Sequence, residues 1–298
     1  MSFKPCGRSL RLSLLSIVAT LGSFSALPAS AQNCDRGCLN DLLTVYVDAM
    51  VAKDHTRLPV ADNVKYTVDG EAAKLGEGVW QTVTGAQGFR QDYLDVKEQV
   101  AAAHVAFREG DENQILLSVL LHVNADKKLS GIETLVQRIT PTSRFQPTEL
   151  GGPIRGMNDS IPAGQRMNRD NLVNIALTYP EGLRIGSFTD GGTPFAPNTY
   201  RVENGVITAR DEQMYGQNII VHPGIIASVA AVDEENGVVL LWMNFGHTGS
   251  NYGEGNALVT YEAFKIWGNQ IHSINAFFVG LPISRARFWP SIEPVYRR

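Results

Sequence analysis

Two stretches of this chain, LSGIETLV at residues 129–136 and IHSINAFF at residues 271–278, can be laid over each other without a gap. Both have isoleucine at the fourth position, both end in large apolar residues, and both follow turn-forming residues, as strands usually do. The segments before them also match in type and order. We therefore predict that the chain is an internal duplication, in which each copy ends in this strand.

The first copy begins with an amphipathic helix at residues 38–52, where apolar side chains recur at three- and four-residue spacing. An alternating strand at 63–69 runs into Asp69-Gly70, which is a strong turn signal. A bent hairpin and a short helix follow. The copy is then completed by three strand candidates, at 99–108, 114–123 and 129–139.

Residues 140–166 are rich in Pro, Gly, Thr and Ser and have no periodicity, which is typical of a linker. We place the first domain at 33–145, the linker at 146–164 and the second domain, with a C-terminal tail, at 165–298. In the second domain we expect a helix at 168–179 and strands at 199–209, 225–232, 238–245, 258–267 and 270–279.

The N-terminus has the features of a secretory signal. Lys4, Arg8 and Arg11 precede an apolar run that is shorter than the roughly 20 residues of a membrane span. The small residues Ala29-Ser30-Ala31 then match a signal-peptidase site. We predict that residues 1–31 are a signal peptide and that the protein is exported, to the periplasm or outside the cell.

Charge and motifs exclude several classes of function. The formal net charge of −4 argues against nucleic acid and anionic membranes as partners. Nucleotide-binding, zinc-peptidase and serine-hydrolase motifs are absent from the sequence, and the six histidines never fall at paired ligand spacing. We therefore expect no cofactor and no metal. Cys34 and Cys38 are expected to form a local disulfide in an oxidising compartment, with free thiols as the alternative.

Several segments carry a family resemblance: CDRGCL (34–39), LGEGVWQTVTG (75–85), FRQDYLD (89–95), GIETLVQR (131–138), VAAVDEENGVVLLWMNF (229–245) and YEAFKIWGNQIHSINAFF (261–278). With the predicted order of elements, the chain resembles the nuclear transport factor 2-like superfamily, and within it a fungal and bacterial domain of unknown function. This superfamily of cystatin-like α+β barrels includes ketosteroid isomerases, SnoaL-like cyclases and catalytically inert modules.

The resemblance implies an α+β fold of two tandem cone-shaped barrels, each a curled antiparallel sheet with helices packed on it. It also implies a homodimer or homotrimer that associates through the open sheet face. Because the superfamily includes cofactor-independent lyases that release formaldehyde from lignin-derived diarylpropanes, we expect a lyase or isomerase that acts on a small hydroxylated aromatic compound by dehydration or retro-aldol cleavage. The alternative is an exported module that binds a small molecule without turnover.

Four residues of the first half are candidates for acid/base work, because carboxylates, histidines and tyrosines in an apolar pocket can exchange protons with a ligand. By strand parity His104 shares a face with small residues, which would leave room for a ligand. Glu133 lies in an apolar strand, where an unpaired carboxylate is costly. The alternatives are a satisfied core histidine and a surface ion pair. The four candidates are His104, Glu133, Tyr93 and Tyr46.

Further residues are candidates for binding the substrate. In the first half, Arg90 and Asp92 can orient a hydroxyl, although they can also form a simple surface bridge. The first-half set is Trp80, Arg90, Asp92 and His122. The second-half set is Glu203, His222, Trp242 and His247, with Arg201 and Asn244 nearby. The sequence does not indicate which half is active.

Overall fold

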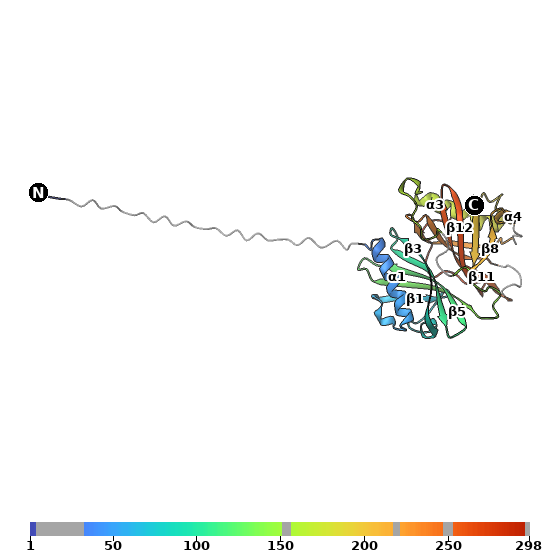
Figure 1. Ribbon diagram of the computed structural model, residues 1–298, viewed down its shortest axis with the longest axis horizontal. Helices are drawn as coiled ribbons and strands as arrows, with labels where there is room; N and C mark the ends of the chain where they lie inside the picture. Colours follow the sequence, from blue (N-terminus) through green and yellow to red (C-terminus); the bar gives the residue numbers. More distant parts are fainter. Residues whose placement is uncertain (4–32, 151–155, 217–220, 247–252, 296–298) are drawn as a thin grey trace. The chain divides into compact units, whose positions relative to one another are not determined.

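The computed structural model describes residues 1–3, 33–150, 156–216, 221–246 and 253–295 (Figure 1). Residues Gln32–Arg298 form one compact unit. The predicted signal peptide lies outside the described residues, except for Met1–Phe3. The disulfide between Cys34 and Cys38 is present.

The described residues form two six-stranded sheets with the same strand order. The first sheet has the order β2-β1-β6-β5-β4-β3. Its elements are α1 (Arg36–Val51), η1 (His55–Arg57), β1 (Val60–Val68), β2 (Glu71–Ala72), α2 (Val79–Thr82), β3 (Val83–Asp95), β4 (Val100–Glu109), β5 (Asn113–Val123) and β6 (Leu129–Ile139).

The second sheet repeats this arrangement as β8-β7-β12-β11-β10-β9. Its elements are η2 (Ala163–Gln165), α3 (Arg169–Ile185), β7 (Phe195–Glu203), β8 (Val206–Arg210), α4 (Gln213–Gly216), β9 (Ile226–Asp233), β10 (Val238–Asn244), β11 (Asn256–Trp267) and β12 (Gln270–Pro282). The prediction of two tandem α+β domains is confirmed.

The sheets differ from the expected barrels in two respects. They are open, and each is mixed, because β1 runs parallel to β6 and β7 runs parallel to β12. In each copy the first strand pairs with the last strand, and the other strands lie between them in the sequence. No hairpin connects the two, so nothing forces the pair to be antiparallel. The predicted strand at 199–209 is also two strands, because Asn204 and Gly205 both have positive φ and form a tight hairpin turn.

Local sequence explains the ends of the two long helices. The side chain of Asp35 accepts a hydrogen bond from the Cys38 amide at the start of α1, and Asn168 accepts one from the Asn171 amide at the start of α3. Gly186, with a φ of 80°, ends α3 in the left-handed conformation. Each helix therefore begins at a fixed place against its own sheet.

Each sheet uses its two faces differently. On β4, Ala101 and Ala103 belong to the core beneath α1, whereas Ala102 packs in a second core with residues of the other sheet. Ala231 and Ala263 are part of that second core. The face on which the expectation of a homodimer or homotrimer rested is therefore buried inside the chain.

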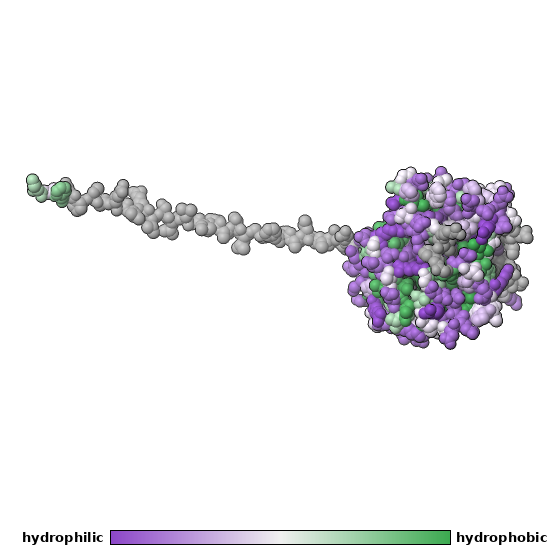
Figure 2. Space-filling model, viewed as in Figure 1, coloured by the Kyte–Doolittle hydropathy of each residue, from purple (hydrophilic) through white to green (hydrophobic). Residues whose placement is uncertain are grey.

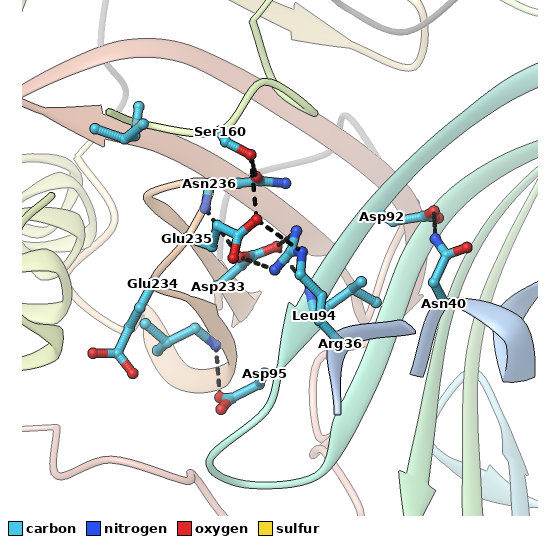
Figure 3. A network of polar contacts seen from close by, with 12 residues as sticks. Arg36, Asn40, Asp92, Leu94, Asp95, Ser160, Asp233, Glu234, Glu235 and Asn236 are labelled. Atoms are coloured by element: carbon cyan, nitrogen blue, oxygen red, sulfur yellow. Dashed lines mark hydrogen bonds and ion pairs between the residues drawn. The ribbon is translucent and has the colours of Figure 1, made fainter. Parts of the chain in front are cut away.

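We call the sheet β2-β1-β6-β5-β4-β3 with α1 the first unit, and the sheet β8-β7-β12-β11-β10-β9 with α3 the second unit. Two reciprocal ion pairs join these two units. Arg36, the first residue of α1, donates to both carboxylate oxygens of Asp233 at 2.7 and 2.8 Å, as Figure 3 shows. Arg169, the first residue of α3, donates to both oxygens of Asp95 at 3.0 and 2.7 Å. This exchange is the contact pattern of a two-fold interface between identical subunits, here within one chain.

The surface in the view of Figure 2 is mostly hydrophilic, with scattered hydrophobic patches. Within the described ranges, no helix has the length and apolar character that crossing a membrane requires.

Candidate functional site

A buried carboxylate lies on the face of the second sheet that turns toward α3. Glu262 on β11 is 2% exposed. Its cross-strand neighbours are Leu241 on β10 and Ala276 on β12, and the next strand places Glu203 beside Ala276. Residues paired across a sheet point to the same face. The two glutamates therefore lie on one face with a small alanine between them.

Tyr179 and Arg201 complete this group. Arg201 on β7 donates a hydrogen bond to the Tyr179 hydroxyl at 2.9 Å, and it forms an ion pair with Glu203 at 3.3 Å. It also donates to Thr208 at 3.0 Å. Oε1 of Glu262 is buried and has no hydrogen-bond partner among the described residues. We call Tyr179, Arg201, Glu203 and Glu262 the second-unit cluster.

Burial controls the protonation of this cluster. Burial raises the pKa of the Glu262 carboxyl from 4.5 to about 8, while Arg201 acts to lower it and Glu203 to raise it. Burial also raises the pKa of the Tyr179 hydroxyl, which stays protonated. The pKa of Arg201 is raised, because its partners outweigh the opposing effect of burial. Glu262 is therefore a base that can hold or release a proton near neutral pH. It lies beside the Tyr179 hydroxyl, which remains a hydrogen-bond donor.

Aromatic rings surround the tyrosine. The ring of Tyr179 lies 4.8 Å from Phe188, 5.0 Å from Phe264 and 6.4 Å from Phe195, measured between centroids. The Tyr215 hydroxyl accepts a hydrogen bond from the Phe195 amide at 3.0 Å, which ties α4 to the start of β7. An apolar wall with a few polar groups is the usual lining of a site for small aromatic molecules.

The first unit lacks this chemistry. Thr134 and Ala276 occupy the same place in the two overlaid strands, and the neighbours of Thr134 across the sheet are two valines, Val119 and Val68. Carboxylates are therefore missing at the two places where the second unit has its glutamates. Tyr66, two residues before Val68, replaces the arginine.

The predicted catalytic residue His104 lies between the sheets. Its Nδ1 is 3.1 Å from the Tyr93 hydroxyl and 2.9 Å from Nδ2 of Asn275, and its ring stacks on Phe277 at 4.5 Å. Burial lowers the pKa of His104 to about 3. The small-residue face that was expected to leave room for a ligand is filled by the second sheet, so His104 and Tyr93 share no compartment with Glu262.

Glu133 also lies on the face between the sheets, with all its acceptors in use. Its carboxylate contacts Nε2 of His122 at 2.7 Å, the Tyr261 hydroxyl at 2.9 Å and Arg287 at 2.6 Å. Burial opposes ionisation, but His122 and Arg287 outweigh it and hold the pKa of Glu133 below its usual value. Trp289 stacks on His122 at 4.6 Å. This group ties the C-terminal tail to the first sheet.

The other first-half candidates are divided between two places. Tyr46 and Trp80 meet edge to face in the core beneath α1, with ring centroids 5.4 Å apart. Arg90 and Asp92 form an ion pair at 2.7 Å on the edge strand β3, and Asp92 accepts from Asn40 at 2.9 Å (Figure 3). This is the simple bridge that the sequence left open as the alternative.

The remaining second-half candidates are dispersed. Trp242 belongs to the core between the sheets. Asn244 donates to two carbonyl oxygens of the C-terminal tail at 3.0 and 2.8 Å. His222 is nearly buried against Phe245, with ring centroids 5.0 Å apart, and burial lowers its pKa. His247 lies outside the described residues.

A groove of about 990 Å³ lies beside α3, and it does not include the second-unit cluster. Its walls come from α3, from residues 223–227 and from residues 291–295 of the tail. The grooves described for these ranges are lined by other residues than Glu262, which is itself 2% exposed, whereas Arg201 and Glu203 are partly exposed.

Sequence reasoning missed Glu262 and Tyr179, although both had signals. Glu262 interrupts the run LVTYEAFKIW, which is apolar on both strand faces, so its side chain is buried on whichever face it lies. Tyr179 lies ten residues after the first residue of α3, as Tyr46 does in α1. Applied to Tyr46, the duplication would have pointed to Tyr179 as the matching residue of the second half.

Comparisons with known proteins give little information on function. Residues 165–278 match the model of a family described as a domain of unknown function (DUF8021). Curated proteins yielded no match. Among solved structures, the chain is similar to a de novo designed protein with a curved β-sheet, at 15% identity over 37% of this chain and 87% of the designed one, with a TM-score of 0.28. That score supports no conclusion about function.

In the ranges that the structure describes, no group of three or more His, Cys, Asp or Glu side chains is placed to hold a metal ion.

Proposed function

We propose that the chain is an exported, cofactor-independent lyase or isomerase that acts on a small hydroxylated aromatic compound, with its chemistry at the second-unit cluster. The observation that supports this most is the buried Glu262 carboxylate, which has a side-chain hydrogen bond with Tyr179 while its Oε1 lacks a partner among the described residues. A buried carboxylate oxygen without a partner costs stability, and such costs are concentrated where a protein uses the group.

The cluster assigns a role to each of its residues. Ionised Glu262 takes the proton of a substrate hydroxyl or of an activated C–H group. The Tyr179 hydroxyl accepts a hydrogen bond from Arg201, so its own proton is available to the oxygen on which negative charge develops. Glu203 holds Arg201 in place through their ion pair. Phe188 and Phe264 supply an apolar wall for an aromatic ring.

A retro-aldol step shows how the atoms balance. Glu262 removes the hydroxyl proton of an aryl-substituted primary alcohol, and the carbon–carbon bond breaks to release formaldehyde. The electron pair of that bond remains on the benzylic carbon, which then receives the proton back from Glu262. Dehydration uses the same base on a C–H group, while Tyr179 donates its proton to the departing hydroxyl.

The alternative is an exported module that binds a small molecule without turnover. The burial of Glu262 favours it, because a residue that is 2% exposed is poorly accessible to a substrate. In that case the cluster holds the hydroxyl of a ligand and transfers no proton.

The test is formaldehyde release from a phenolic diarylpropane-1,3-diol by the wild-type protein and by single variants. Glu262→Gln should lower the turnover number by roughly a hundred- to ten-thousandfold, the contribution of a positioned general base. Glu133→Gln and His104→Ala serve as controls. Each of these variants should keep its turnover number if it remains folded. Full activity of Glu262→Gln would refute the assignment. Binding without any product would favour the non-catalytic alternative.

A further inference from the structure

A hollow of about 380 Å³ lies between the first sheet and the predicted linker. Its walls come from β3, β4, β5 and residues 147–150. Its volume falls within the range of about 300–1,000 Å³ that is usual for small-molecule pockets. Phe107 belongs to the core beneath α1, so the next residue, Arg108, points to the opposite face of the sheet. The hollow is therefore distinct from the space beneath α1.

A β-bulge in β3 shapes this hollow. The register between β3 and β4 shifts between Ala86 and Arg90, where β3 has more residues than the facing part of β4. Gly88, inside the bulge, has a φ of 82°, a region that favours glycine. Bulges often re-aim side chains next to binding sites. Here Gln87 of the bulge and Gln114 of β5 both line the hollow.

The guanidinium of Arg108 is held in place by a glycine. Gly85 pairs with Arg108 across the two strands, and a Cβ at Gly85 would collide with Nη2 of that arginine. Across the described ranges no carboxylate forms an ion pair with Arg108, and the adjacent Glu109 is engaged by Arg138 at 3.1 Å. Of the described residues that line the hollow, Arg108 alone is charged. Its side chain is exposed, so a solute can reach it.

The second unit fixes the opposite wall of the hollow. The amides of Thr148 and Glu149 donate to the carbonyl oxygen of Gly205 at 2.9 and 3.0 Å. A Cβ at Gly205 would come within 2.6 Å of Pro147, so this segment lies closely on the turn between β7 and β8. Leu150 belongs to a core that residues of both sheets share. The hollow is therefore complete only when the two units are docked.

The lining indicates the kind of molecule that fits. A guanidinium fork binds a carboxylate through two parallel hydrogen bonds, which a point charge cannot do. The two glutamine amides and the Thr148 hydroxyl can hydrogen-bond to further oxygen atoms of a ligand. Pro147 and Leu150 provide apolar surface on the other side. A flat ring that bears a carboxylate matches both sides, and it loses little conformational entropy on binding.

We infer that this hollow is a binding site for a small aromatic carboxylate, whose oxygens pair with Arg108 and whose ring packs against Pro147 and Leu150. The site involves no proton transfer and is independent of the function proposed for the second-unit cluster. Because one wall is attached to each unit, a bound carboxylate also stabilises the docked arrangement of the two units.

The test follows binding of 4-fluorobenzoate to the whole protein by fluorine NMR. Arg108→Gln should weaken binding by about tenfold or more, because the charge-assisted pair is lost. Gly85→Ala keeps the charge but displaces the guanidinium, so it should also weaken binding. The neutral analogue 4-fluorobenzyl alcohol should bind the wild-type protein at least about tenfold more weakly than the carboxylate. Glu262→Gln should bind 4-fluorobenzoate normally, which separates this site from the proposed active site.

Arg210→Gln is the matched control. Arg210 is an exposed arginine on the edge strand β8, and it lines none of the grooves described for these ranges. This variant should bind the probe as the wild type does. Since Arg108 is exposed, Arg108→Gln should keep the melting temperature of the free protein, so that its loss of binding reports on the site.

Three results would overturn the inference. They are absence of binding to the wild-type protein, unchanged binding by Arg108→Gln, and displacement of the probe by inorganic phosphate at equal concentration. The last result would show a general attraction of anions to an exposed arginine. Displacement by unlabelled benzoate, with phosphate at least about tenfold less effective, is the expected outcome.

Discussion

Glu262→Gln should remove a large pH dependence of the stability of the protein. Below pH 4.5 the carboxyl is protonated in both the folded and the unfolded state, so the free energy of unfolding is not affected by it. Between pH 4.5 and about 8 the unfolded chain releases the proton while the folded protein keeps it. The folded protein therefore loses stability as the pH rises through this window.

The size of the loss follows from the two pKa values. Their difference of about 3.5 corresponds to roughly 5 kcal/mol at pH 8 and above. Relaxation of the protein around the charge lowers this figure, so it is an upper value. Even half of it is larger than the effect of most single substitutions. Glutamine has nearly the same shape and no charge, so the variant should become the more stable protein above neutral pH.

Urea unfolding at several pH values between 4.5 and 9 measures this directly. The difference in unfolding free energy between Glu262→Gln and the wild type should grow with pH by up to about 1.4 kcal/mol per pH unit and level off near pH 8. Glu112→Gln, in the exposed turn before β5, is the control and should show no such trend. Parallel pH profiles for wild type and Glu262→Gln would show that Glu262 ionises normally in the folded protein, and the acid/base reasoning would fail.

Three further predictions concern other parts of the chain. Arg287→Ala should destabilise the protein by about 3–5 kcal/mol, because it removes the buried charge partner of Glu133 and leaves only His122 and Tyr261 in contact with it. Urea unfolding measures this loss, and a value below about 1 kcal/mol would contradict the role of the pair. Light scattering should find a monomer, since the outer faces of both sheets are buried on each other; a stable dimer would require another interface. Intact-mass analysis of the exported protein should show a chain that starts at Gln32 and contains no free thiol; a mass that includes residues 1–31, or alkylation without reduction, would contradict this.

His104 and Glu133 show the limit of reasoning from strand parity. Parity assigned His104 to the face it shares with Val100 and Ala102, and the structure confirms that face. Parity is a property of one strand, so it carries no information about what covers the face. That is decided by contacts between residues far apart in the chain, such as His104 with Asn275.

The second-unit cluster shows the same limit for a site. Glu203 was a candidate from sequence, but Glu262 and Tyr179 were not. Tyr179, Arg201 and Glu262 lie on three separate elements, α3, β7 and β11. The sheet register brings Arg201 and Glu262 to one face, and the packing of α3 on that face adds Tyr179. Local patterns report burial and secondary structure, whereas a site depends on which buried groups meet.

The amino-acid sequence alone was sufficient for the duplication, the helix that opens each copy and the tight turn at Asp69-Gly70, although it missed strand β3 and took β7 and β8 for one strand. These features depend on periodicity, turn chemistry and short spacing, all of which act within a few residues. Only the tertiary structure decided that the two sheets cover each other, that His104 and Glu133 belong to that interface, and that the buried Glu262 carboxylate meets Tyr179 in the second unit. Those outcomes depend on desolvation and pairing between distant segments, whose free energies exist only once the chain is packed.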